Sequence, residues 1–138
     1  MSDYKPKYIK AFSEMAKCFG NTSEACRKKA GALIVKNGHI ISQGVNGQPS
    51  GWPTEVCEDE NNVTLPTVRH AEAAALEKLQ RSTESSEGAD IFITLSPCLD
   101  CAIKIKSSGI RRVYYSEDYR KSDGIEYLRA SGVEVTKV

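Results

Sequence analysis

Two short stretches of the chain carry side chains that together could bind a metal ion and move a proton. His70 stands two residues before Glu72, and Cys98 stands three residues before Cys101. One imidazole and two thiolates are enough to hold a catalytic zinc ion, which keeps a fourth position open for water. The two cysteines can face one ion if they lie in the first turn of a helix, where Pro97 is tolerated. Glu72 then stays outside the ligand set, and its expected role is proton transfer.

These four side chains predict a hydrolytic reaction. A bound zinc ion lowers the pKa of water, and Glu72 can take up the proton that is released. The resulting hydroxide can attack a ring carbon that carries an amino group. Glu72 would then pass the proton to the ring nitrogen and help ammonia to leave. No organic cofactor is needed for these steps.

Two other interpretations of the cysteines stay open. Cys98 and Cys101 could be a redox dithiol, although that motif leaves the histidine and the glutamate without a role. They could also belong to a structural zinc site, with Cys57 or Cys26 as the fourth ligand. A structural site has no use for a glutamate two residues after its histidine. The pattern therefore favours a catalytic zinc.

The composition is typical of one globular domain covering residues 1–138, because 40% of the residues are hydrophobic and 27% are charged. The net charge of +1 gives no chain-wide attraction to nucleic acid or to an anionic membrane, so neither is expected as a partner. The five cysteines are odd in number, and no apolar run has the length of a membrane span. We therefore expect a cytoplasmic protein, in the host cytoplasm if the chain is viral.

The order of the predicted elements indicates the fold class. Asn37-Gly38 joins two short apolar stretches and favours a β-hairpin, because both residues can take the positive φ of a type I′ turn. Helical and extended patterns alternate along the rest of the chain. The expected helices are 6–19, 70–81, from Pro97 to about 108–109, and 123–130; the expected strands are 32–36, 39–43, 91–95, 112–116 and 133–138. Alternation of this kind predicts an α/β fold, a three-layer α/β/α sandwich with a mixed five-stranded sheet.

Two irregular segments precede the histidine. Arg27, Lys28 and Lys29 form a basic cluster before the first strand, and such a cluster is either a solvated loop or a phosphate site in which arginine binds bidentately. Residues 44–69 are long for a loop inside a small domain. Asn46 lies in their glycine-rich first part, and its amide can donate and accept hydrogen bonds at once.

With these motifs in place, the chain resembles the cytidine deaminase superfamily over nearly its whole length, and within it the deoxycytidylate (dCMP) deaminases of bacteria and phages. The resemblance rests on five stretches of sequence: Ala30-Gly31-Ala32, residues 44–51, His70-Ala71-Glu72, residues 96–101 and residues 115–119.

The resemblance implies conversion of dCMP to dUMP and ammonia, with zinc on His70, Cys98 and Cys101 and with Glu72 as the proton shuttle. It also implies a set of substrate-binding residues: Asn46 near the sugar, Arg27 and Tyr119 as candidates for the 5′-phosphate, and Ala71.

Regulation is implied as well. The resemblance predicts a homo-oligomer, often a hexamer, that dCTP activates and dTTP inhibits, with Mg²⁺ accompanying the triphosphate. Gly44, Gly47 and Arg81 are then candidates for an effector site between subunits. The chain departs from the usual family pattern at Val45, where the family usually has tyrosine, and at Ala74, where it usually has asparagine.

Three alternatives come from other classes. A tRNA adenosine deaminase shares both zinc motifs, but a net charge of +1 is low for a protein that binds an RNA backbone. A nucleoside cytidine deaminase usually has cysteine in place of His70 and needs no phosphate ligands. A structural-zinc interaction module is distinguished from both by Glu72.

Overall fold

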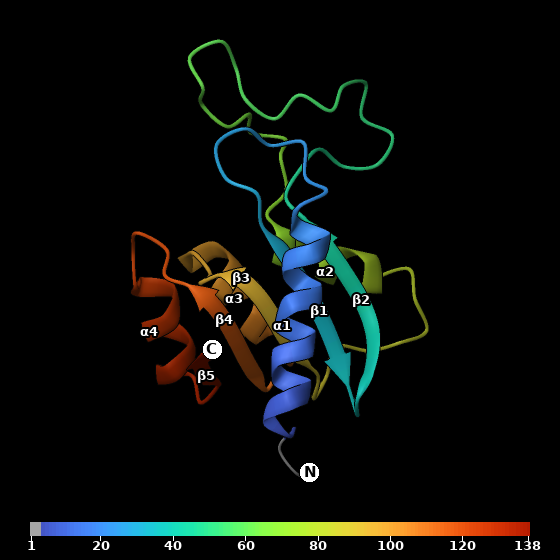
Figure 1. Cartoon of the computed structure of the whole chain (residues 1–138), viewed down its shortest axis with the longest axis vertical. Helices are drawn as coiled ribbons and strands as arrows, with labels where there is room; N and C mark the ends of the chain where they lie inside the picture. The colour runs from blue at the N-terminus through green and yellow to red at the C-terminus, as the bar shows by residue number, and fades with distance from the viewer. Residues whose placement is uncertain (1–3) are drawn as a thin grey trace.

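The computed structural model describes residues 4–138, which are arranged around one sheet (Figure 1). Its strands are β1 Gly31–Lys36, β2 His39–Val45, β3 Asp90–Leu95, β4 Arg112–Glu117 and β5 Glu134–Lys137. Its helices are α1 Pro6–Gly20, α2 Ala71–Leu79, α3 Leu99–Ser107 and α4 Asp123–Ala130. The strand order is β2-β1-β3-β4-β5; β1 is antiparallel to both of its neighbours, and β3, β4 and β5 are parallel. The prediction of a mixed five-stranded sheet is therefore confirmed.

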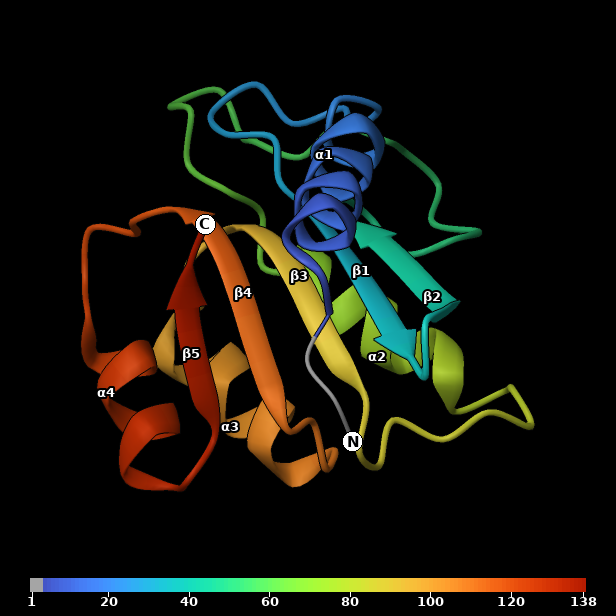
Figure 2. The same ribbon diagram turned by 60° about the horizontal axis from the view of Figure 1, so that its bottom comes forward.

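The helices form a layer on each face of the sheet (Figure 2). Helix α1 covers one face, where Ala16 packs with the buried residues Leu33, Val35, Phe92 and Tyr114. Helices α2, α3 and α4 cover the opposite face and contribute to a larger apolar cluster. Strands β1 and β3 are buried almost throughout because both of their faces are covered. Within residues 4–138, no helix is both long and apolar enough to span a membrane.

The predicted hairpin turn is present, with positive φ at Asn37 (52°) and Gly38 (82°). Both strands are longer than expected, since Gly31 pairs with Val45 at the open end of the hairpin. The pairing brings Asn46 beside the residues that precede β1.

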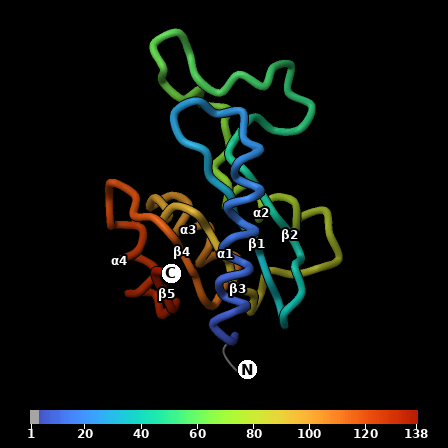
Figure 3. The backbone as a smooth tube through the Cα atoms, in the orientation of Figure 1, coloured from blue at the N-terminus to red at the C-terminus, as the bar shows by residue number. Residues whose placement is uncertain are grey.

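The mixed strand directions gather one set of loops at a single edge of the sheet. The amino end of β1 lies there together with the carboxyl ends of β2, β3 and β4. Two long segments, residues 21–30 and 46–69, extend beyond this edge (Figure 3). Residues far apart in the sequence therefore meet around the ends of the central strands.

Strand β3 begins one residue earlier than the expected range of 91–95. Asp90 is the first residue of the strand and is fully buried. Its carboxylate accepts hydrogen bonds from Arg111 (3.1 and 3.3 Å) and from Arg112 (3.0 and 3.3 Å). The two guanidinium groups offset the cost of burying the charge. This cluster lies at the end of β3 opposite to the gathered loops.

The helix predicted over residues 70–81 is shorter than expected. Its N-cap is His70 and its last residue is Leu79. It ends there because the N–H groups of Gln80 and Arg81 donate to carbonyls three residues earlier, in a tighter turn. Arg81 therefore lies beyond the helix.

Candidate active site

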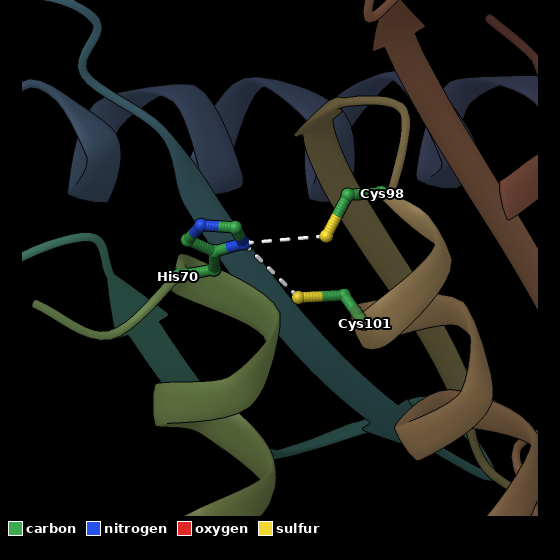
Figure 4. Close-up of side chains that lie close together, drawn as sticks. All are labelled: His70, Cys98 and Cys101. Carbon is green, nitrogen blue, oxygen red and sulfur yellow. Dashed lines mark hydrogen bonds between the residues drawn. The ribbon is translucent and has the colours of Figure 1, made fainter. Parts of the chain in front are cut away.

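Three potential metal ligands converge where α2 and α3 begin (Figure 4). His70 Nδ1 lies 3.2 Å from the Sγ of Cys101 and 3.5 Å from the Sγ of Cys98. His70 is the N-cap of α2, Cys98 is the N-cap of α3, and Cys101 lies in the first turn of α3. Pro97 stands one residue before the N-cap, not inside the first turn as predicted. The starts of two helices thus bring the predicted ligands together.

The geometry of this cluster fits a zinc ion. Zinc bonds of about 2.3 Å to sulfur and about 2.0 Å to nitrogen, at tetrahedral angles, separate a nitrogen from a sulfur by roughly 3.5 Å. All three donor atoms lie within 4.8 Å of one another. Glu72, Cys26 and Cys57 are not part of the cluster, and the described residues contain no second group of this kind. A fourth protein ligand, which a structural zinc site would need, is therefore not supplied by these side chains.

Local electrostatics favour a thiolate at Cys98. Hydrogen bonds from Cys101 and His70 lower the pKa of Cys98 to about 3, and the N-terminus of α3 favours negative charge at the same place. The hydrogen bond to Cys98, together with burial, raises the pKa of Cys101. The hydrogen bond with Cys98 also raises the pKa of His70.

Glu72 lies in the first turn of α2 and faces the same site. The residue is only 7% exposed, and this burial raises its pKa to about 7. A carboxyl group with such a pKa can both accept and release a proton near neutral pH. Its exclusion from the metal cluster leaves it available for that role.

A cavity of about 360 Å³ opens beside the cluster, at the edge of the sheet where the loops gather. Its lining includes all the residues that were expected to bind the substrate or move the proton, namely Arg27, Asn46, Ala71, Glu72 and Tyr119, together with His70 and Cys98. It also includes Lys28, from the basic cluster proposed as a phosphate site, and four polar residues that sequence reasoning had not assigned, namely Glu58, Thr64, Ser96 and Arg120. Its size is in the range of pockets that bind small molecules.

Asn46 braces the basic segment that forms one wall of the cavity. Its Oδ1 accepts the N–H of Ala30 at 2.8 Å, and its Nδ2 donates to the carbonyl of Lys28 at 2.6 Å. An amide group has two N–H donors and two lone pairs, so these bonds leave capacity for a ligand.

Ser96 ties a second wall of the cavity together. It follows β3 directly and is 3% exposed, and its Oγ accepts the N–H of Tyr119 at 2.6 Å. The bond fixes the loop after β4 to the segment that leads into Cys98. The sequence does indicate a role for Ser96, because this residue follows the carboxyl end of a buried strand and stands immediately before the cysteine motif.

The three effector candidates do not line the cavity. Gly47 pairs with Arg69, with backbone hydrogen bonds of 3.0 and 2.8 Å, beside the N-terminus of α2. Arg81 lies past the C-terminus of this nine-residue helix, which is roughly 14 Å long. Gly47 and Arg81 therefore lie near opposite ends of α2.

Gly44 sets the distance between β2 and the helix that carries His70 and Glu72. A Cβ atom at this position would lie 2.4 Å from the Ala71 carbonyl oxygen and 2.5 Å from the Ala75 nitrogen. Ser42 Oγ donates to the Ala75 carbonyl at 2.7 Å, and this bond also holds β2 against α2. The glycine is thus required by close packing of strand on helix.

We expect Gly44→Ala to destabilise the protein by about 1–3 kcal/mol, because the backbone of α2 must shift to admit the methyl group. The corresponding fall in Tm is roughly 4–12 °C for a chain of this size. Gly47→Ala is the matched control, since nothing lies within 4 Å of a Cβ there. Equal Tm values for the two variants, measured by thermal denaturation, would contradict the packing role.

Comparison with known proteins places this site in a family. The family model for the cytidine and deoxycytidylate deaminase zinc-binding region matches residues 6–117. The chain belongs to this family. The matched range includes the three clustered ligands and Glu72.

Individual relatives of this deaminase agree with the family match. A dCMP deaminase from the cyanophage S-TIM5, solved in complex with dCMP and dUMP, is 45% identical, with a TM-score of 0.96 over 99% of this chain and 100% of that chain. An uncharacterized deaminase from the luxG 3′ region of Aliivibrio fischeri is 36% identical over 94% of this chain and 92% of its own length. The deoxycytidylate deaminase of phage T2 is 30% identical over 91% and 89%.

Proposed function

We propose that this deaminase hydrolyses dCMP to dUMP and ammonia, using one zinc ion per chain held by His70, Cys98 and Cys101. The observation that carries the proposal is one cavity that contains both the Glu72 side chain and the basic residues Arg27 and Lys28. A pyrimidine base could lie beside Glu72 while its 5′-phosphate reaches the basic wall. The full-length similarity to a dCMP deaminase supports the same substrate. A nucleotide substrate is in keeping with the cytoplasmic location expected from the sequence.

Glu72 carries the proton transfers in this proposal. A zinc ion, when bound, supplies the Lewis acidity that makes water nucleophilic near neutral pH. Glu72 accepts a proton from the attacking water and delivers it to the ring nitrogen next to the amino-bearing carbon. It then takes the remaining proton from the added hydroxyl group and delivers it to the amino group, so that ammonia leaves and a carbonyl remains. Because Glu72 is almost fully buried, these transfers are shielded from bulk water.

The loops around the cavity orient the substrate. We assign Asn46 to the sugar, Ala71 to the base, and Arg27 and Tyr119 to the 5′-phosphate. Arg27 lies in the wall before β1 and Tyr119 in the wall after β4. A nucleotide held at both walls keeps its base directed toward Glu72, and positioning of this kind is a large part of enzymatic rate enhancement.

Replacing Arg27 by alanine should raise the KM for dCMP by roughly 10- to 100-fold, the range expected from the loss of charge-assisted hydrogen bonds to a phosphate. The weak reaction with deoxycytidine, which has no phosphate, should change far less. Lys29→Ala is the control, because Lys29 is an exposed neighbour in the same basic cluster that does not line the cavity. Steady-state kinetics on both substrates check the prediction, and an equal loss on dCMP and deoxycytidine would reject the phosphate role.

We further propose that dCTP activates and dTTP inhibits this deaminase, each bound with Mg²⁺ between subunits of a hexamer. Gly44, Gly47 and Arg81 are the effector candidates. The separation of Gly47 from Arg81 along α2 is consistent with a site that two chains complete together. Activity at subsaturating dCMP, measured with and without dCTP and Mg²⁺, tests this regulation.

A further inference from the structure

A small antiparallel loop inside the 46–69 segment reaches across to Arg27. Residues 57–65 fold back on themselves, with backbone hydrogen bonds from Leu65 to Cys57 (2.8 Å) and from Asp59 to Val63 (2.9 Å). Cys57 is 1% exposed and anchors the base of this loop. The loop therefore has a defined shape, although it lies in a segment without long strands or helices.

The paired residues Glu58 and Thr64 of this loop contact both ends of Arg27. Glu58 Oε2 accepts the backbone N–H groups of Cys26 (3.0 Å) and Arg27 (3.2 Å). The guanidinium of Arg27 donates from Nη1 to Thr64 Oγ1 at 3.5 Å. The same loop thus holds the backbone of Arg27 through one residue and its guanidinium through the residue opposite.

We propose that Glu58, assisted by Thr64, is the positioning residue that fixes Arg27 for the 5′-phosphate and so makes the enzyme selective for the nucleotide over the nucleoside. The inference rests on the proposed deamination of dCMP. Arg27 lies in a segment without helix or strand, so its direction depends on such contacts. Glu58 and Thr64 line the same cavity as Arg27, and their contacts with it span more than thirty residues of sequence.

A carboxylate near a phosphate can affect phosphate binding in two opposite ways. Glu58 can strengthen binding by positioning Arg27, or it can weaken binding by repelling the phosphate. Two consecutive N–H groups directed at one oxygen form an anion-binding site that Glu58 already fills. If Glu58 positions Arg27, its removal weakens substrate binding. If instead it only repels or competes with the phosphate, its removal strengthens binding. The sign of the change in KM separates these roles.

The experiment compares Glu58→Ala, Glu58→Gln and Thr64→Val with the control Glu60→Ala, which alters an exposed carboxylate in the same loop. For each full-length, zinc-loaded variant, kcat and KM are measured with dCMP, and deoxyuridine is used as a competitive inhibitor that lacks the phosphate. We expect Glu58→Ala to raise the KM for dCMP on the order of tenfold, the scale of effect that a misplaced binding group produces. The kcat and the Ki for deoxyuridine should each change less than about twofold, since the zinc ligands and Glu72 are untouched.

Glu58→Gln should give a smaller increase in KM, because the amide keeps an oxygen that can accept the two N–H groups. Thr64→Val should also raise KM, by less than Glu58→Ala. An unchanged or lowered KM in Glu58→Ala would overturn the proposal, as would equal losses for dCMP and deoxyuridine, which indicate general damage to the site. A wild-type protein without activity on dCMP would contradict the proposed function itself, before any variant is compared.

Discussion

Glu72→Gln should lower kcat for dCMP by about 10²–10⁴-fold, the usual contribution of a general acid–base group. Glutamine has nearly the same shape but cannot accept and return a proton. Since Glu72 is buried and outside the metal cluster, the variant should keep its fold and its zinc. Single-turnover kinetics and zinc content per chain measure the two effects separately.

Glu77→Gln is the matched control for this prediction. It makes the same chemical change on the same helix, but Glu77 is about half exposed, pairs with Arg69 at 3.3 Å, and does not line the cavity. Its kcat should stay within about twofold of the wild type, as for most surface substitutions. If Glu72→Gln were as active as Glu77→Gln, Glu72 would not be the proton carrier.

Cys98→Ala should reduce bound zinc far below one ion per chain and remove most of the activity. Only His70 and Cys101 would remain as ligands, and zinc sites in proteins almost always use at least three. Because metal binding contributes to folding free energy, the variant should also respond less to a chelator than the wild type does. Metal analysis after dialysis, followed by thermal denaturation with and without chelator, checks both expectations.

Cys18→Ala is the control here, because Cys18 is an exposed thiol on α1, far in sequence from the cluster. It should retain full zinc content. An unchanged stoichiometry in Cys98→Ala would show that the ligand set is wrong.

The candidate metal ligands could be found from the sequence because their geometry is largely local. A histidine at the N-cap of a helix places a glutamate two residues later in the first turn of that helix. A cysteine at the N-cap likewise places a cysteine three residues later in the first turn. Short-range spacing therefore carries most of the arrangement of His70, Glu72, Cys98 and Cys101. What the sequence does not specify is that the two helix starts meet, which follows from the strand order of the sheet.

The contacts of two carboxylates were not predictable from the sequence, because they are long-range. Glu58 contacts residues more than thirty positions earlier, and Asp90 pairs with arginines more than twenty positions later. Neither carboxylate belongs to a motif. An isolated acidic residue in a polar stretch gives no sign of whether it is solvated or buried against a distant cation.

Helix ends and packing faces were only partly predictable. The helix after His70 ends two residues early, because the N–H groups of Gln80 and Arg81 donate to carbonyls three residues earlier instead of four. On α1, the buried positions are Ala16 and Gly20, while the larger Met15 and Phe19 are each 37% exposed. Small residues let this helix approach β1 closely. The face of α1 that packs on the sheet therefore carries Ala16 and Gly20, and the larger side chains of Met15 and Phe19 stay partly exposed.

The most direct test of the central claim is ammonia release by the purified, zinc-loaded protein supplied with dCMP, with deoxycytidine, CMP and an adenosine-containing tRNA stem-loop in parallel. We expect turnover of dCMP with little or no reaction on deoxycytidine or the stem-loop, because Arg27 and Glu72 act at the two ends of one nucleotide-sized cavity. CMP has the same base and phosphate, so its rate relative to dCMP measures discrimination at the sugar alone. Ammonia release from the stem-loop but not from dCMP would contradict this expectation, as would silence on all four substrates.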